Sequence, residues 1–174
     1  IGSEQIISAL FGYGSFTDKS VFHSANALYY FGLGLPAFAL IKVFSTFFFA
    51  NHDTKTPFYI SLVSVLLNIL ISVYFFKDIG FIIIPIATTI SSWFNSLILF
   101  IYLKNNNLFE FNKSFFKQFV KIIFASVMMG IFFQYLILSF ENQLSYSYFF
   151  KSAYLLVCVL LTIFFYLALS YFIK

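Results

Sequence analysis

The chain alternates long apolar runs with short polar segments, and this pattern predicts its elements. Five apolar runs are long enough to form membrane helices, and they occupy residues 21–50, 58–76, 81–103, 115–140 and 147–173. An α-helix rises 1.5 Å per residue, so about 20 residues cross the ~30 Å hydrocarbon core of a bilayer. The pattern therefore predicts an all-α membrane fold, a polytopic bundle of five transmembrane helices.

Strands are the alternative to helices in these runs, because Phe, Ile and Tyr favour sheets. Strands of a membrane barrel alternate polar and apolar positions in segments of about ten residues. Residues 58–76 and 147–173 are instead apolar on every face. We therefore exclude the barrel and expect helices.

The first 20 residues are more mixed. Apolar residues recur at helical spacing at Ile6, Ile7 and Leu10, so this stretch either ends an earlier membrane helix or lies in the membrane interface. Two glycines then interrupt the pattern, and either Thr17 or Asp18 can cap the helix that follows. The chain does not begin with Met, and we expect it to be a fragment cut at its N-terminus, with a partial helix there.

Composition supports the membrane assignment. The chain has 174 residues, of which 61% are hydrophobic and only 9% are charged, whereas a soluble domain carries roughly 25% charged residues. Too little polar surface remains to cover the outside of a globule, so lipid must be the outer solvent.

The lysines predict how the helices are oriented. The formal charge of +4 arises from ten lysines and no arginine. Most lie in short loops, which indicates membrane-flanking charge and no nucleic-acid partner. With one intramembrane lysine left out, the two sides carry Lys55, Lys104, Lys113, Lys117, Lys121 and Lys174 against Lys19, Lys77 and Lys151. Cytoplasmic loops carry the excess of basic residues, so we expect the six-lysine side, with the C-terminus, to be cytoplasmic.

Lys42 is the sharpest candidate for function. It lies eight residues before Ala50, and so about 12 Å from the end of its helix. An ionisable residue inside a span is costly and usually faces a cavity or a partner. Two interpretations stay open. Lys42 is either a cavity cation that meets an anionic head group, or a side chain that reaches back to the cytoplasmic interface.

A compact polar turn at residues 51–57 separates the first two apolar runs. Either Asp53 or Thr54 can cap the second helix, and Pro57 sits where a proline at the first helical position belongs. His52 beside Asp53 suggests a metal or proton relay, but one His and one Asp are too few for a metal site. We interpret the turn as structural or gating.

Polar side chains also lie inside the second and third runs. They are Asn68, Thr88, Thr89, Ser91, Ser92 and Asn95. Such residues either line a water-filled path or hydrogen-bond to a neighbouring helix, and we favour interhelical packing. Gly32 and Gly34, close to Pro36, admit a close neighbour or let the first helix bend.

No motif of an enzyme is present. The chain contains no Gly-rich phosphate loop, no CxxC, no HExxH and no nucleophile elbow. No two acidic residues fall at helical spacing within a span. We therefore expect no enzyme activity, no catalytic residue, no cofactor and no metal.

Residues 11–57 resemble the MurJ/MviN family of lipid II flippases. The family's F-x-x-G-x-F-T segment is similar to FGYGSFT at the start of this stretch. The family's next features are A-x-x-x-Y-x-x-G-L, a Lys followed by Val, and F-Y-A-x-x-D-T-K-T-P, and they resemble YYFGLGLPAFALIKVFSTFFFANHDTKTP, with Phe49 in place of the family's Tyr. The matched candidate site residues are Lys42 in the helix and Asp53, Lys55 and Pro57 in the turn.

The resemblance implies the fold of the multidrug/oligosaccharidyl-lipid/polysaccharide (MOP) exporters, with two six-helix lobes around a central cavity. Residues 1–20 then end a preceding helix and form a periplasmic loop. Residues 21–104 complete the second lobe, and residues 105–174 form a cytoplasmic linker and an extra C-terminal helix pair that makes a groove for the lipid tail. The implied orientation agrees with the lysine count.

The implied function is translocation of lipid II, the undecaprenyl-linked peptidoglycan precursor, across the bacterial cytoplasmic membrane by alternating access. The family's cavity arginines transfer to no residue of this chain, since it contains no Arg. Two alternatives stay open: a flippase for another polyprenyl-linked glycan or a drug exporter of the same fold, and a non-transporting membrane scaffold. The expected partners are lipid II, membrane lipids and cell-wall synthesis proteins.

Overall fold

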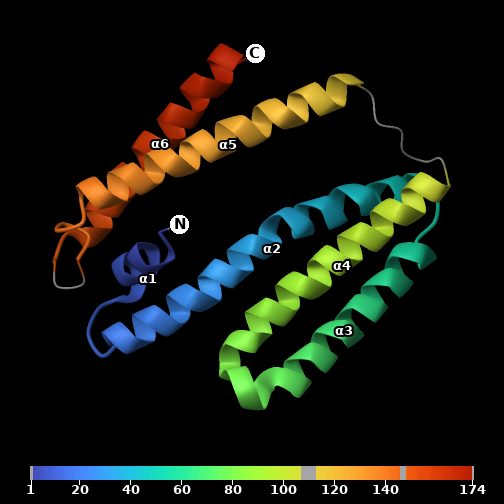
Figure 1. The fold of residues 1–174 in the computed structure, drawn as a ribbon, viewed down its shortest axis with the longest axis horizontal. Coiled ribbons are helices and arrows are strands. Elements are labelled where there is room, and N and C mark those ends of the chain that lie inside the picture. The colour runs from blue at the N-terminus through green and yellow to red at the C-terminus, as the bar shows by residue number, and fades with distance from the viewer. Residues whose placement is uncertain (1, 107–112, 146–147, 174) are drawn as a thin grey trace. The chain divides into compact units, whose positions relative to one another are not determined.

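A computed structural model describes residues 2–106, 113–145 and 148–173. Every regular element within these ranges is a helix, which confirms the all-α fold class (Figure 1). The elements are α1 (Ser3–Phe11), α2 (Asp18–Ala50), α3 (Lys55–Ile79), the short 3-10 helix η1 (Gly80–Ile82), α4 (Ile83–Asn105), α5 (Lys113–Ser139) and α6 (Lys151–Ile173).

The predicted helix starts are each displaced by two to four residues, and those of α2 and α6 have a clear local reason. The α2 helix begins at Asp18 because Thr17 caps it, accepting a hydrogen bond from the Ser20 amide over 3.4 Å. The α6 helix begins at Lys151, later than expected, because the Lys151 amide still donates to Tyr148 in a turn of three residues. The expected start at Ser147 lies outside the described residues.

Four continuous helical stretches are long and apolar enough to cross a membrane: Asp18–Ala50, Lys55–Asn105, Lys117–Ser139 and Lys151–Phe172. The second stretch reverses at Gly80, whose φ of 75° suits a residue without a Cβ. It therefore contains α3 and α4, of 25 and 23 residues. Each of these rises about 35 Å, enough for one crossing. Counted in this way, the described helices supply the five expected spans.

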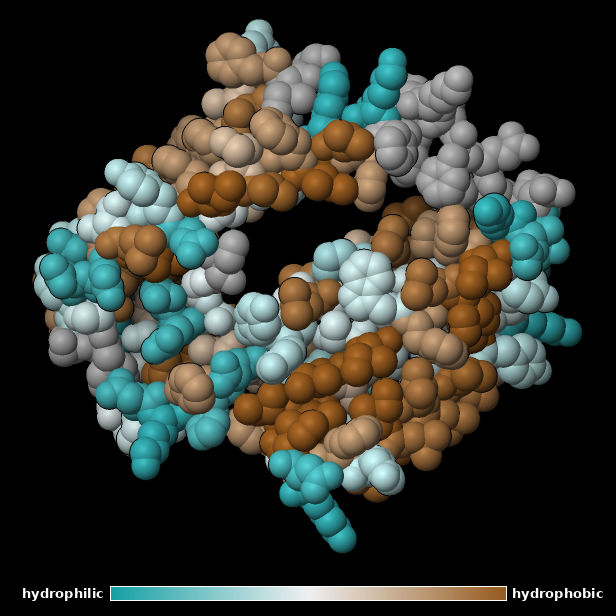
Figure 2. Space-filling view, viewed as in Figure 1, coloured by the Kyte–Doolittle hydropathy of each residue, from teal (hydrophilic) through white to brown (hydrophobic). Residues whose placement is uncertain are grey.

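The outward surfaces of the helices are apolar. Val73, Tyr74 and Phe164 are 71%, 76% and 69% exposed. Figure 2 shows brown, hydrophobic side chains over the visible faces of α3 and α4. Large apolar areas of this extent are rare on proteins that face water, but they are the expected surface of helices that face lipid.

The chain divides into two compact units. One contains Asn26–Glu110, and the other combines Ile1–Ala25 with Phe111–Lys174. This grouping is structural, and the division into a lobe and an extra helix pair stays a prediction.

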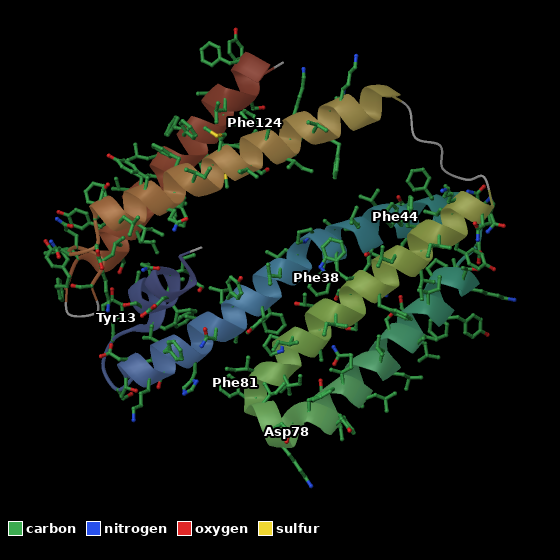
Figure 3. The ribbon with its side chains drawn as sticks, viewed as in Figure 1. Tyr13, Phe38, Phe44, Asp78, Phe81 and Phe124 are labelled. Atoms are coloured by element: carbon green, nitrogen blue, oxygen red, sulfur yellow. The ribbon has the colours of Figure 1, made fainter. Side chains whose placement is uncertain are left out.

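The unit that contains most of α2 with α3 and α4 has its core near the Asp53 turn. Phe48 and Leu99 are 1% and 0% exposed, and they pack together with Phe44, Ile60 and Leu103. Figure 3 shows Asp78 and Phe81 at the opposite end, flanking the reversal between α3 and α4.

The other unit packs α1 and the first turns of α2 with α5 and α6. Ala9 of α1 joins Ile137, Leu144 and Leu155 in one apolar cluster. Phe132 of α5 stacks on Phe165 of α6, with ring centroids 4.3 Å apart. The contacts of α1 with α6 thus complete a packed unit around the last two helices.

Candidate functional site

Lys42 lies on the side of α2 that faces away from α4. Phe44, which packs into the core with Leu99, is two residues further on, so the two side chains point about 160° apart around the helix. Lys42 is exposed, and it makes no hydrogen bond or ion pair within the described part of the chain. The structure therefore leaves this ammonium group available to a ligand or to another part of the protein.

A groove begins one turn further along the face of α2 that carries Lys42. Ser45 and Phe49 follow Lys42 by three and seven residues, the spacing of one helix face. Both line an open pocket of about 470 Å³ that runs from α2 to the start of α3. The remaining lining residues are Thr54, Pro57, Phe58 and Ser61. The groove surface is mostly apolar, and three of its lining residues, Ser45, Thr54 and Ser61, carry a hydroxyl group.

The turn after α2 closes the helix with backbone hydrogen bonds. The Asp53 amide donates to the Phe48 carbonyl, and the His52 amide donates to the Phe49 carbonyl, both over 3.0 Å. His52 adopts a left-handed backbone with a φ of 59°. This is a Schellman motif, which satisfies carbonyl groups that a helix end would otherwise leave unpaired. Asn51 adds a side-chain bond to Phe47, over 2.8 Å.

Asp53 caps the start of α3. Its Oδ1 accepts hydrogen bonds from the backbone amides of Lys55 and Thr56, over 3.1 and 3.0 Å. The carboxylate thus satisfies two of the free amides at the helix start. Of the two expected caps, Asp53 makes these bonds, and Thr54 makes no side-chain cap bond. Pro57 is the third residue of α3, so the expectation of a first-position proline was wrong by one half-turn.

Hydrogen bonds hold the pKa of Asp53 below its ordinary value. The largest contribution is a hydrogen bond from the Thr56 side chain, followed by the one from the Thr56 amide. The positive charge of Lys55 adds a smaller effect in the same direction. Each of these interactions favours the carboxylate over the neutral acid. The charged form of Asp53 is therefore part of the folded turn.

The described residues hold no cluster of three or more His, Cys, Asp or Glu side chains that suits a metal ion. His52 and Asp53 lie side by side in the turn, but Asp53 is engaged in capping. The arrangement is that of a rigid connection between two helices.

The polar residues of α3 and α4 bond to one another across the helix pair. Asn68 Nδ2 donates to Thr88 Oγ1 over 3.1 Å and to Ser91 Oγ over 3.3 Å. Asn95 Nδ2 donates to Ser61 Oγ over 3.4 Å. These contacts confirm the favoured interhelical packing for Asn68, Thr88, Ser91 and Asn95. The Ser92 hydroxyl instead donates to the Thr88 carbonyl within α4, over 2.6 Å.

A second set of contacts joins α4 to the part of α2 just before Pro36. Thr89 Oγ1 donates to the Tyr30 carbonyl over 2.7 Å, and Trp93 Nε1 donates to the Leu33 carbonyl over 3.1 Å. A Cβ on Gly34 would lie 3.1 Å from Thr89 Oγ1, so glycine permits the close approach. The expected role of Gly34 is confirmed, whereas Gly32 has open space beside it.

Lys151 occupies a place that the sequence did not indicate. It was counted with the loop lysines, yet it is 1% exposed at the start of α6. Its Nζ donates to the Gly12 carbonyl over 2.7 Å and lies 4.4 Å from the centre of the Tyr13 ring. The Tyr13 hydroxyl also bonds to Ser152, and Figure 3 shows Tyr13 in the segment that joins α1 to α2.

The chain matches known proteins over most of its length. The sequence profile of the family described as "Lipid II flippase MurJ" matches residues 1–166. A probable lipid II flippase MurJ of Thermotoga maritima is 35% identical over 128 residues, which are 74% of this chain and 25% of that protein.

Two further relatives carry the same description, probable lipid II flippase MurJ. The protein of Rickettsia prowazekii is 36% identical over 100 residues, 58% of this chain and 20% of its own length. The protein of Rhizobium meliloti is 39% identical over 98 residues, 56% of this chain and 18% of its own length. The chain thus spans about a fifth to a quarter of the length of these relatives.

Proposed function

Because the chain belongs to the lipid II flippase MurJ family, we propose that it serves in a flippase that moves undecaprenyl-diphospho-muropeptide, lipid II, from the inner to the outer leaflet of the bacterial cytoplasmic membrane. The profile match over residues 1–166 is the observation that carries this proposal. The apolar helices agree with a multi-pass membrane protein of a transporter family. Transport by alternating access is the mechanism, in which one lobe rocks against the other around the head group.

Lys42 is proposed to face the substrate cavity. A lysine at the centre of a membrane helix costs about 3 kcal/mol on insertion scales, so such residues usually face a cavity, a partner or water. Lys42 is exposed, lies away from α4 and has no partner within the described residues. Its ammonium group would attract the anionic head group, while α5 and α6 would hold the lipid tail.

The turn after α2 is proposed to keep α2 and α3 in register at the cytoplasmic side. The Schellman motif and the Asp53 cap support this role, because both connect the last turn of α2 directly to the first turn of α3. The six-lysine side, which includes Lys55, supports placing this turn and the C-terminus in the cytoplasm.

Genetic complementation tests the function. The full-length gene is expressed in cells depleted of their own flippase, and growth and lipid II in the outer leaflet are measured. We expect rescue by the wild-type protein. Absence of rescue despite normal amounts of protein in the membrane would overturn the proposal.

Variants of Lys42 test its role in the same cells. We expect Lys42→Ala to lower rescue and Lys42→Arg to retain most of it, because Arg keeps the positive charge. Lys77→Ala is the matched control, since Lys77 is an exposed lysine in the last turn of α3. An equal effect of the two alanine variants would refute a cavity role for Lys42.

Cysteine labelling tests where Lys42 faces. The single native cysteine is first replaced by Cys158→Ser, and Lys42→Cys is then treated with a membrane-impermeant thiol reagent. We expect labelling from the watery cavity, and block by an excess of substrate. Leu70→Cys, 67% exposed in the middle of α3, is the lipid-facing control. Equal lack of labelling at both positions would show that Lys42 faces lipid or protein.

A further inference from the structure

The turn of α2 that ends at Pro36 is the weakest part of this helix. Pro36 has no backbone N–H, so the carbonyl of Gly32 loses its usual donor four residues on. Gly34 adds flexibility to the same turn. Proline inside a helix commonly produces a kink of more than about 20°. Yet α2 is one continuous helix from Asp18 to Ala50, so contacts from a neighbouring helix can stabilise the turn at Pro36.

The two halves of α2 are attached to α4 in different ways. Beyond Pro36, Phe44 and Phe48 are anchored by apolar packing against Leu99 and Leu103. Before Pro36, the attachment is made by hydrogen bonds from side chains to backbone carbonyls. A kink at Pro36 would therefore change the second attachment while the first stays in place.

The hydrogen bonds come from two residues one turn apart on α4. Thr89 and Trp93 donate to the carbonyls of Tyr30 and Leu33, which lie on either side of the carbonyl that Pro36 leaves without its donor. A carbonyl oxygen has two lone pairs, so it can accept such a bond beside its helical one. In membranes, side chains of neighbouring helices are a known means of stabilising a turn interrupted by proline.

We propose that Thr89 and Trp93 are positioning residues that fix the angle of α2 at Pro36. They thereby set the direction of the half that precedes Pro36 relative to the anchored half that carries Lys42. This inference rests on the proposed function of Lys42 for its biological meaning, but the angle itself can be measured separately. With Thr89 and Trp93 unable to donate, the first half of α2 tilts away from α4.

Distance measurement by electron paramagnetic resonance tests the angle in the full-length protein. In the Cys158→Ser background, spin labels are placed at Leu28→Cys and Leu70→Cys, both on exposed positions. Leu28 lies eight residues before Pro36, about 12 Å along the helix, so a 20° tilt moves it by about 4 Å. We expect the combination of Thr89→Val and Trp93→Phe to change the mean distance between the two labels by up to about 4 Å.

A matched label pair reports on the other half of α2. The pair Val43→Cys with Leu70→Cys keeps one label and moves the second beyond Pro36, and its distance should not change. Equal shifts for both pairs would indicate general loosening of the helices and would overturn the inference. An unchanged distance for Leu28 would also overturn it.

Two rescue variants separate positioning from simple packing. Thr89→Ser keeps the hydroxyl donor and should preserve the wild-type distance. Pro36→Ala restores the missing amide, so it should return the distance to its wild-type value even with Thr89→Val and Trp93→Phe present. If Pro36→Ala does not restore the distance, the two side chains act by packing alone, and the inference that they fix an angle at Pro36 is overturned.

Complementation with the same variants connects the angle to transport. A shifted distance together with reduced rescue, and recovery of both by Pro36→Ala, is the expected result. A shifted distance with full rescue would refute a role of the angle in transport. Failure of the wild-type protein to rescue would refute the proposed function and leave the distance result standing.

Discussion

Phe48 and Phe49 provide a direct test of how this protein is packed at the Asp53 turn. They are adjacent residues with the same side chain, but Phe48 is 1% exposed and Phe49 is 52% exposed. Phe48 packs against Leu99 and Leu103, whereas Phe49 lines the open groove. Replacing each by alanine removes the same atoms, so any difference in stability arises from their surroundings.

The expected cost can be estimated from the cavity that each substitution leaves. Lipid is as apolar as a helix interface, so transfer of the ring contributes little. Loss of a phenyl ring from a packed site leaves a cavity on the order of 100 Å³, and at about 24 cal/mol per Å³ this costs about 2 kcal/mol. At Phe49 the space is filled by solvent or lipid, so we expect a change below about 0.5 kcal/mol, as at other surface sites.

Thermal unfolding in detergent of the full-length protein measures the difference. The relatives contain about 500 residues, and at an unfolding entropy of about 2.1 cal/mol/K per residue a loss of 2 kcal/mol corresponds to a fall in Tm of roughly 2 °C for Phe48→Ala. Phe49→Ala should leave Tm within about 0.5 °C on the same scale. Equal losses for the two variants, or a greater loss for Phe49→Ala, would refute the packing described for this end of α2.

Three further predictions concern the backbone of the same unit. The pKa of Asp53 is lowered on folding, so its contribution to stability is complete above its unfolded pKa of about 4 and is lost as pH falls through the lower folded pKa. Asp53→Asn should flatten the fall in Tm below about pH 4, and an unchanged pH profile would argue against the cap. His52→Gly should stabilise the protein by up to about 1 kcal/mol, because relief of the left-handed backbone, about 1–2 kcal/mol, exceeds the added entropy of the unfolded chain, about 0.5–1 kcal/mol. His52→Val should destabilise the protein, and the opposite order of Tm values would contradict this prediction. Gly34→Leu should lower Tm, because its Cβ would lie 3.1 Å from Thr89 Oγ1. Gly32→Leu should leave Tm unchanged, because the space beside Gly32 is open. Similar Tm values for the two variants would refute the close approach of Thr89 to Gly34.

The helices could be predicted from the sequence because each is encoded locally. Apolar runs of sufficient length, low charge and the turn at residues 51–57 are properties of single segments, and they predicted five spans. The Thr17 and Asp53 caps were among the expected ones, because a cap depends on residues within one turn of the helix. The position of Lys42 along its helix follows in the same way from a constant rise per residue.

Pairing between segments was decided by the tertiary structure. The Lys151 side chain bonds to Gly12, which is 139 residues away in the chain, and nothing in the local sequence distinguishes this lysine from the loop lysines. Likewise, the polar residues of α4 could be recognised, but not that Thr89 bonds to α2 while Thr88 receives a bond from α3.

The physical reason is the solvent of these helices. In water, an apolar stripe shows which face of a helix packs inward, because the opposite face must be polar. In lipid both faces are apolar, so the outward-facing Val73 and the buried Leu99 are chemically alike. The sequence by itself therefore determined where the helices run and how they end. Only the close fit of small residues and interhelical hydrogen bonds in the folded protein determined which faces meet.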